Sequence, residues 1–298
     1  MEKYKKAGVN RLSIGLQSAD DEELQILGRI HTFEKFVKTY EKARNAGFAN
    51  INVDLMSGIP YQTAEKFLHT LQKVVRLKPN HISAYSLIIE KGTPFYEKYK
   101  FDVTLQEAGK QTTVLPTEDE VYRITKLTQQ YLEKAGYEQY EISNFARHGF
   151  PCIHNLKYWN CEEYLGFGPG AYSYFNSTRF SFVRNIEAYI KGVADPQSRV
   201  NLTEGLEEIS GRAQLGEYIM LGLRLSDGIS VSEIARRYGV DFAALYGKKA
   251  DKYIKYGYMT YKGDRIALTP SGMFISNHIL SDILSFEDLG ALSPAGKF

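Results

Sequence analysis

The feature that most constrains the fold is an alternation of short apolar stretches and amphipathic stretches in the first third of the chain. Apolar, strand-like stretches occupy residues 9–16, 51–56 and 82–88. Between them, hydrophobic side chains recur at helical spacing over residues 33–43 and 67–75. Short strands separated by helices form βαβ units, so we predict a parallel sheet, either doubly wound or part of a barrel.

The middle of the chain has a different pattern. Thr117 and Glu120 have capping-box spacing ahead of a long amphipathic helix that ends at Gly136. Residues 137–184 are rich in aromatic residues, glycine and asparagine, without a long helical period. We therefore expect loops and short strands around a site in this segment.

The last hundred residues are mainly helical in pattern. After a linker at 195–197, the spacing of apolar residues predicts helices at 204–225, 232–238 and 242–256. A hairpin signal follows at 262–264, and a proline at 270 opens a final helix. This order suggests a small winged-helix-like module. We thus predict three domains, at residues 1–115, 116–195 and 196–298.

Composition excludes several classes of protein. Of the 298 residues, 43% are hydrophobic and 24% are charged, which is typical of a globular chain rather than a disordered or fibrous one. No apolar run is long enough to span a bilayer, and the N-terminal residues have no signal-peptide pattern, so we expect a cytoplasmic protein. The formal net charge of +2 does not by itself indicate nucleic acid or an anionic membrane as a partner.

The two cysteines, Cys152 and Cys161, are too few for a disulfide framework. Their spacing does not match a zinc site or an iron–sulfur site. We therefore expect small buried side chains at both positions and no cluster held by this chain.

Polar residues near the strand ends are candidate ligand contacts, because parallel α/β folds bind ligands at the carboxyl ends of their strands. Gln17 and Ser18 end the first predicted strand, and Asp54 lies inside the second. An unpaired buried carboxylate is costly, so Asp54 either forms an ion pair or contacts a ligand such as ribose hydroxyl groups. Arg29, taken alone, is typical of a solvated arginine.

Residues 152–160 hold the densest chemistry of the sequence. Trp159 is the single tryptophan, His154 can ligate iron, and Tyr158 could ligate or stack. A histidine among aromatic residues is more often structural than a ligand. These residues alone therefore permit a tetrapyrrole site without requiring one.

Several of these segments resemble a known family. VNRLSIGLQS at 9–18, LGRIH at 27–31 and DLMSGIP at 54–60 are similar to the second half of the radical S-adenosylmethionine (SAM) domain of the oxygen-independent coproporphyrinogen III oxidase family. HNLKYW at 154–159 matches the HNxxYW pattern of its heme-chaperone, HemW-like branch. The resemblance covers essentially the whole chain. It implies an α/β fold: the C-terminal half of a partial (β/α) radical SAM barrel, an α+β region and a winged-helix-like module.

The resemblance implies a SAM site at Gln17, Arg29, Asp54 and Ile88, with Tyr172 at a position that contacts adenine through its backbone. The chemistry of these residues is suitable. Asp54 can accept hydrogen bonds from the ribose hydroxyls, and Arg29 can pair with the methionine carboxylate. Gln17 can bridge polar groups, and Ile88 can cover the adenine ring.

The same resemblance implies a heme site at His154, Asn155, Tyr158 and Trp159, with His154 as the candidate iron ligand. Heme or a porphyrin would then be the ligand, and a heme-acceptor protein a partner. Our preferred interpretation is a heme-binding, chaperone-like member of the radical SAM family that acts in porphyrin and heme metabolism.

Intact family members carry a CxxxCxxC motif, which holds a [4Fe-4S] cluster, in β/α units ahead of those present here. Nothing before Val9 supplies this motif. We expect a truncated product, a split gene or a fragment that does not by itself cleave SAM to a 5′-deoxyadenosyl radical. The missing strands would leave a sheet edge open, so we also expect a dimer or a partner chain that supplies the missing half.

Two alternatives remain open. The first is oxygen-independent coproporphyrinogen III oxidase, which converts two propionates of coproporphyrinogen III to vinyl groups and yields protoporphyrinogen IX. The HNxxYW match and the missing cluster motif argue against it.

The second alternative is nucleic-acid binding by the C-terminal module. Lysines fall on one predicted helical face and further cations flank the predicted hairpin, at Lys248, Lys249, Lys252, Lys255, Lys262 and Arg265. A solvated lysine face explains this pattern better, so nucleic acid is the less favoured partner.

Overall fold

The computed structural model describes residues 1–195, 197 and 202–284, and the chain divides into two compact units at residues 151 and 152. The predicted linker at 195–197 is described at its first and last residues, and residues 285–298 of the predicted C-terminal module lie outside the described residues. Within the described part, no helix has the length and apolar character needed to cross a membrane.

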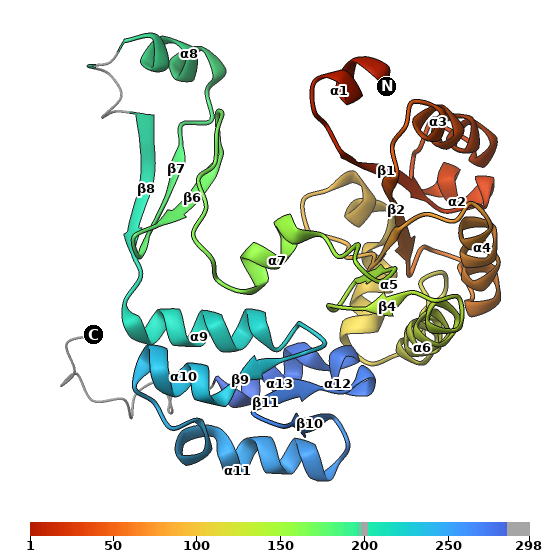
Figure 1. Ribbon diagram of the computed structural model, residues 1–298. Coiled ribbons are helices and arrows are strands. Elements are labelled where there is room, and N and C mark those ends of the chain that lie inside the picture. Colours follow the sequence, from red (N-terminus) through yellow and green to blue (C-terminus); the bar gives the residue numbers. More distant parts are fainter. Residues whose placement is uncertain (196, 198–201, 285–298) are drawn as a thin grey trace. The chain divides into compact units, whose positions relative to one another are not determined.

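The first unit, whose strands β1, β2 and β4 are labelled in Figure 1, is built on a mixed sheet with strand order β1-β2-β3-β5-β4. The strands are β1 (Arg11–Gln17), β2 (Asn50–Ser57), β3 (His81–Ser86), β4 (Glu138–Gln139) and β5 (Asn144–Ala146). The first three run parallel, which confirms the predicted βαβ units, whereas β5 and β4 are antiparallel to their neighbours. This order places β1 at an edge of the sheet.

The helices of this unit are α1 (Glu2–Lys6), α2 (Asp21–Ile26), α3 (Phe33–Asn45), α4 (Ala64–Arg76), α5 (Pro94–Glu107) and α6 (Glu118–Lys134). Threonine hydroxyls cap the N-termini of α3, α4 and α6, at Thr32, Thr63 and Thr117. The sequence analysis missed α5, although Thr93 caps it and Pro94 opens it. Its apolar residues do not gather on one face, so no helical period marked it.

The two faces of the parallel strands differ in character. Ile51, Val53 and Ile82 are fully buried and belong to one hydrophobic core with side chains of α3, α4 and α6. Because successive side chains of a strand point to opposite faces, the residues between them lie on the other face. Asn52 and Asp54 occupy that face of β2, which is therefore polar.

The first half of the second unit contains the helix α7 (Ile153–Trp159) and an antiparallel sheet of order β6-β7-β8. Its strands are β6 (Tyr172–Phe175), β7 (Thr178–Phe182) and β8 (Thr203–Glu208), and α8 (Ile186–Ala194) lies in the connection between β7 and β8 (Figure 1). Two expectations were wrong here. Residues 153–159 form a helix instead of loops or strands, and residues 204–208 form a strand instead of a helix because they pair with β7.

The C-terminal half of this unit has the predicted order of helices around a hairpin. Its elements are α9 (Gly211–Gly222), β9 (Ile229–Ser230), α10 (Val231–Tyr238), α11 (Phe242–Lys255), β10 (Met259–Lys262), β11 (Arg265–Leu268), α12 (Pro270–Phe274) and α13 (Ser276–Ile283). The hairpin of β10 and β11 adds β9 as a third strand. Phe242 and Tyr246 of α11 and Ile266 of β11 are fully buried in a common core.

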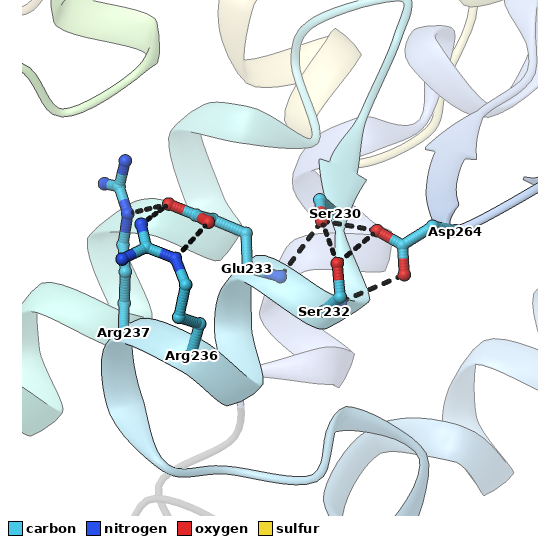
Figure 2. Close-up of polar contacts among 6 residues, drawn as sticks. All are labelled: Ser230, Ser232, Glu233, Arg236, Arg237 and Asp264. Atoms are coloured by element: carbon cyan, nitrogen blue, oxygen red, sulfur yellow. Dashed lines mark hydrogen bonds and ion pairs between the residues drawn. The ribbon is translucent and has the colours of Figure 1, made fainter.

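A polar cluster joins the hairpin turn to the start of α10 (Figure 2). The carboxylate of Asp264 accepts hydrogen bonds from the hydroxyls of Ser230, at 2.5 Å, and Ser232, at 2.8 Å. The Ser230 hydroxyl also accepts from the backbone N–H of Glu233 and so caps α10. One turn further on, the Glu233 carboxylate pairs with Arg236 and Arg237. Hydrogen bonds from Ser230 and Ser232 to Asp264 therefore hold the turn of the hairpin against the start of α10.

Candidate functional site

Four of the positions predicted for SAM lie in the first unit, within the parallel strands or in the connections that follow them. Gln17 ends β1, Asp54 lies in β2, and Ile88 follows β3 by two residues. Arg29 follows α2 in the connection after β1. Ile88 is 79% exposed, and Arg29 is exposed as well. Parallel α/β folds take ligands at the carboxyl ends of their strands.

Gln17 reaches the polar face of the sheet through a local irregularity. Its φ is +72°, and the register with β2 shifts between Gly15 and Gln17. The Gln17 amide nitrogen then lies where a side chain on Gly15 would begin, 2.9 Å from an ideal Cβ. Gly15 of β1 lies directly opposite Asp54 of β2 in the pairing of the two strands. The missing side chain of Gly15 thus leaves room for the Gln17 amide beside β1.

Asp54 is held by neutral donors. Its Oδ2 accepts from the Ser13 hydroxyl at 2.9 Å, and its Oδ1 accepts from the Asn52 amide at 2.7 Å. The carboxylate is partly exposed. Each oxygen has a second lone pair that can accept from a ligand hydroxyl. Of the two roles considered for Asp54, this geometry favours the ligand contact over an ion pair.

Behind Asp54 lies a group of polar residues that the sequence analysis did not single out. His81 is fully buried, with Nδ1 2.6 Å from Asn52 Oδ1 and Nε2 2.7 Å from Tyr140 Oη. Burial, with the nearby Arg11 charge, lowers the pKa of His81 to about 3, so the imidazole is neutral. Ser83 donates to the same Asn52 oxygen at 3.2 Å.

A signal for these residues was present in the sequence. Polar residues alternate with apolar ones at 11 and 13, at 50, 52 and 54, and at 81, 83 and 85. That period of two is typical of a sheet with one polar face. The strands of most parallel sheets are apolar on both faces, and we accordingly interpreted these stretches as apolar strands.

A second carboxylate lies near the same face. Glu141 is fully buried, and burial raises its pKa to about 7 although the backbone N–H groups of Ile142, Ser143 and Asn144 favour the ionised form. Tyr85 at the end of β3 is 40% exposed, and burial together with the charges of Asp54 and Glu141 raises the pKa of its hydroxyl. Asp54 and Glu141 thus bring two carboxyl groups near the Tyr85 hydroxyl.

Tyr172 is the remaining predicted SAM position. It begins β6 in the second unit and is 52% exposed. Its predicted contact is through the backbone. Four of the five predicted positions thus belong to the first unit and one to the second.

The HNxxYW segment is helical, and its spacing has a structural meaning. His154 and Tyr158 are four residues apart on α7, so they share one side of the helix. The Tyr158 hydroxyl lies 3.1 Å from His154 Nε2, and the two rings meet edge to face at 5.1 Å. Asn155 and Trp159 form a second pair at the same spacing, and both are partly buried.

The side of α7 that carries His154 and Tyr158 is accessible. Both residues are exposed, and Tyr158 also packs edge to face against Tyr164 at 4.7 Å. An exposed imidazole beside aromatic rings can ligate heme iron and present an apolar surface to the macrocycle. Sequence reasoning identified these residues, and the structure places them on one helical face.

The cysteines have the character expected of packing residues. Cys152 is buried, and Cys161 is partly buried beside the second core. Burial, assisted by the nearby Glu217 charge, raises the pKa of the Cys161 thiol to about 11. A thiol with this pKa is a poor nucleophile and a poor metal ligand near neutral pH. Across the described residues, no three side chains of His, Cys, Asp or Glu group as a metal site.

The cations predicted for nucleic acid are largely used within the fold. Lys252 pairs with the Asp282 carboxylate at 3.0 Å, and Lys249 donates to the Asp282 carbonyl at 2.6 Å. Lys262 and Arg265 donate to backbone carbonyls of residues 226–228. These contacts engage four of the six predicted cations within the fold, and the structure gives the basic pattern no further support as a phosphate-binding face.

Models of two known protein families match the N-terminal and the C-terminal parts of the chain. Residues 1–74 match the model of the radical SAM superfamily, and residues 209–275 match the HemN C-terminal domain. A solved structure of coproporphyrinogen III oxidase (HemN) from Escherichia coli, described as a radical SAM enzyme, superimposes with a TM-score of 0.73 at 21% identity. It covers 96% of this chain and 66% of the other. This likeness establishes the fold, including the predicted partial barrel.

Curated relatives are similar along nearly the whole chain. The heme chaperone HemW of Bacillus subtilis is 34% identical over 280 residues, which covers 94% of this chain and 71% of the relative. HemW of Escherichia coli is 32% identical over 294 residues, with coverages of 95% and 70%. Such identity over more than two thirds of the relatives' length confirms the predicted branch: this chain belongs to the HemW family of radical SAM proteins.

Proposed function

We propose that this chain binds heme on the exposed side of α7 and acts as a heme chaperone that passes heme to an acceptor protein. The observation that carries the proposal is the pair formed by His154 and Tyr158. Both side chains are exposed on one helical face, within a motif that the sequence analysis associated with heme. The names of the curated relatives support the same function.

The pair offers two kinds of contact to heme. His154 can ligate the iron through an imidazole nitrogen, and ligation through Nε2 requires the Tyr158 hydroxyl to leave that atom. The ring of Tyr158 can then lie against the macrocycle. Asn155 and Trp159, on the neighbouring side of the helix, complete the proposed site. Trp159 is also the single tryptophan of the chain, so its fluorescence reports heme bound nearby.

We further propose that Gln17, Arg29, Asp54 and Ile88, all in the first unit, are positions of a SAM site. Asp54 would receive the ribose hydroxyls, because its two oxygens already accept from Ser13 and Asn52 and keep free lone pairs. Gln17 lies over the same face and adds an amide. Bound SAM supplies an adenosyl group and a reactive sulfonium to such a site.

The residues of this chain do not fit a [4Fe-4S] cluster. A CxxxCxxC site needs three thiolates, whereas the 298 residues contain two cysteines, nine positions apart. The pKa of the Cys161 thiol is also raised to about 11. No chemical step is therefore assigned to a cluster held by these residues.

Coproporphyrinogen III oxidase is the less supported alternative. Its substrate carries four carboxylates, which call for basic side chains in a substrate site. Asp54 and Glu141 instead bring two acidic groups toward the polar face of the sheet. The likeness to the HemN structure, at 21% identity, concerns the fold.

A heme titration of the full chain tests the proposed function. We expect saturable heme binding that produces a Soret band and quenches Trp159 fluorescence. His154→Ala should weaken binding and shift the Soret band, because the iron loses a nitrogen ligand. His148→Ala is the matched control, since His148 is 96% exposed and lies in the other unit. Equal spectra and affinities for the wild type and both variants would contradict the proposal.

A further inference from the structure

We propose that Tyr140, His81 and Asn52 form a directed hydrogen-bond chain that orients the carboxylate of Asp54 toward the ribose of SAM. The proposal rests on the assignment of Asp54 to the SAM site made above. It makes these three side chains positioning residues, which act on the ligand through Asp54 and do not touch it.

The hydrogen-bond chain involves residues of three neighbouring strands, β1, β2 and β3, and of the loop after β4. Tyr140 Oη lies 2.7 Å from His81 Nε2, and His81 Nδ1 lies 2.6 Å from Asn52 Oδ1. Asn52 Nδ2 is 2.7 Å from both Asp54 Oδ1 and Ser13 Oγ. His81 and Asn52 are 0% and 2% exposed, so bulk water does not compete for these contacts.

The direction of every hydrogen bond follows from the carboxylate end. An ionised Asp54 can only accept, so the Asn52 amide must turn its NH₂ group toward it. The Asn52 oxygen then faces His81, whose Nδ1 must carry the proton and donate. Nε2 is left as the acceptor, so the Tyr140 hydroxyl donates to it. One orientation of Asn52 and one tautomer of His81 satisfy all of these contacts.

Burial keeps this arrangement intact across the physiological pH range. The pKa of His81 is lowered to about 3, mainly by burial and further by Arg11. A protonated imidazole would place a donor against the Tyr140 hydroxyl and break the order of the chain. The neutral tautomer therefore persists wherever the protein is folded at neutral pH.

The consequence lies in the orientation of Asp54. Donors reach both of its oxygens, Asn52 at Oδ1 and Ser13 at Oδ2, so the plane of the carboxylate is set by two contacts. Ser13 itself accepts from Asn52 at 2.7 Å, which makes its hydroxyl point to Asp54. The remaining lone pairs are thereby pre-oriented for a ligand with two adjacent hydroxyls, such as a ribose.

A purely structural role explains this chain less well. The opposite face of the same strands is filled by Val53 and Ile82, which bury apolar surface without polar partners. Buried polar groups lose solvation that hydrogen bonds only restore, so apolar side chains would stabilise the sheet at least as well. Because the hydrogen-bond chain ends on the partly exposed carboxylate of Asp54, binding of a ligand by that carboxylate explains why these polar residues are present.

Two tyrosines provide a matched test. Tyr140→Phe removes the hydroxyl that bonds His81, whereas Tyr137→Phe removes a hydroxyl that donates to the Pro79 carbonyl at 2.7 Å and lies outside the chain. Calorimetric titration of the 298-residue chain with SAM measures the dissociation constant. We expect Tyr140→Phe to weaken SAM binding about fivefold and Tyr137→Phe to leave it unchanged.

Two substitutions of His81 separate positioning from packing. The amide nitrogen of asparagine is two bonds from Cβ, as Nδ1 of histidine is, so His81→Asn can still donate to Asn52. His81→Leu fills the space and cannot donate. We expect about tenfold weaker SAM binding for His81→Leu. His81→Asn keeps the donor to Asn52 but loses the contact with Tyr140, so we expect it to weaken binding no more than Tyr140→Phe does, by about fivefold. Nitrogen-15 spectra of His81 should show a proton on Nδ1 in the wild type.

The outcomes separate this proposal from the assignment of the SAM site. If the wild type binds SAM and all four variants bind equally, the SAM site stands and the positioning role is overturned. If the wild type does not bind SAM, the assignment fails and the role fails with it. A proton on His81 Nε2 would overturn the directed chain whatever the binding data. If a tyrosine variant does not fold, the His81 pair decides the question.

Discussion

The side-chain carboxylate of Glu120 in α6 accepts a hydrogen bond from the backbone N–H of Ala64, 2.6 Å away at the start of α4. The capping-box spacing predicted that Glu120 would bond within its own helix. Thr117 does cap α6, but Glu120 reaches across to the neighbouring helix. Glu120 therefore makes a tertiary contact between α6 and α4, two helices that pack on the same sheet, instead of a contact within its own helix.

This contact predicts a specific loss of stability. Glu120→Ala should lower the free energy of unfolding of the first unit by about 1 kcal/mol, because an N-terminal N–H of α4 loses its partner. Glu118→Ala is the matched control in the same turn, since Glu118 is exposed. Urea unfolding followed by circular dichroism measures both. Equal losses for the two variants would show that the cross-helix bond contributes nothing.

Glu141 predicts a pH-dependent stability. Its pKa rises from 4.5 to about 7 on folding, so the folded state holds a proton that the unfolded state releases between these values. Its contribution is therefore fully present below pH 4.5 and is lost as the pH rises through 7. Glu141→Gln should stabilise the protein by up to about 3 kcal/mol at pH 8 and change little at pH 4.

Chemical unfolding at both pH values checks this difference. Glu138→Gln is a suitable control, because Glu138 is three residues away and its side chain is 74% exposed. A gain for Glu141→Gln that is the same at pH 4 and pH 8 would mean that the wild-type carboxyl does not titrate in this range.

Asp102 predicts the opposite dependence on pH. Burial favours its neutral form, but donors from Thr113, Val114 and Leu115 outweigh burial and lower its pKa to about 2. The ionised group therefore stabilises the fold above pH 4, and this stability is lost as the pH falls toward 2. Asp102→Asn should cost about 2 kcal/mol at pH 7. Asp119→Asn, at an exposed position, should cost far less, and a comparable cost would refute the role of these donors.

Two glycines of the C-terminal module predict opposite effects of the same substitution. A Cβ on Gly272 would lie 1.9 Å from the Tyr258 carbonyl oxygen, so Gly272→Ala should strongly destabilise the module. A Cβ on Gly216, within α9, meets nothing within 4 Å. Gly216→Ala should therefore stabilise the helix by about 0.5–1 kcal/mol. Thermal unfolding of the two variants tests both signs, and a neutral Gly272→Ala would show that the backbone can yield there.

The helices and strands that follow a clear period could be predicted from the sequence. The parallel strands, α3, α4, α6 and the hairpin at 262–264 were confirmed because each carries a complete local signal, a period together with a cap or a turn. The errors fall where that signal was weak. Residues 204–208 form a strand because they pair with β7. The seven residues of α7 are too few to show a repeating helical pattern of apolar residues.

The candidate site divides in the same way. His154, Tyr158 and Asp54 were identifiable because their chemistry or motif is local. His81 and Tyr140 were not, since they are 59 residues apart and meet only because β3 and β4 belong to the same sheet. Their polar alternation was visible, but nothing in the sequence shows which residue of another strand each one faces.

By itself, the sequence determined the family, the βαβ order and the residues of the HNxxYW motif, because each depends on residues close together in the chain. The tertiary structure alone decided that the polar residues of three strands form one connected face behind Asp54. It also decided that Lys249 and Lys252 bind Asp282 rather than remaining a free basic face. The physical reason is the short range of a hydrogen bond: its partners are set by strand register and helix packing, which depend on the whole fold.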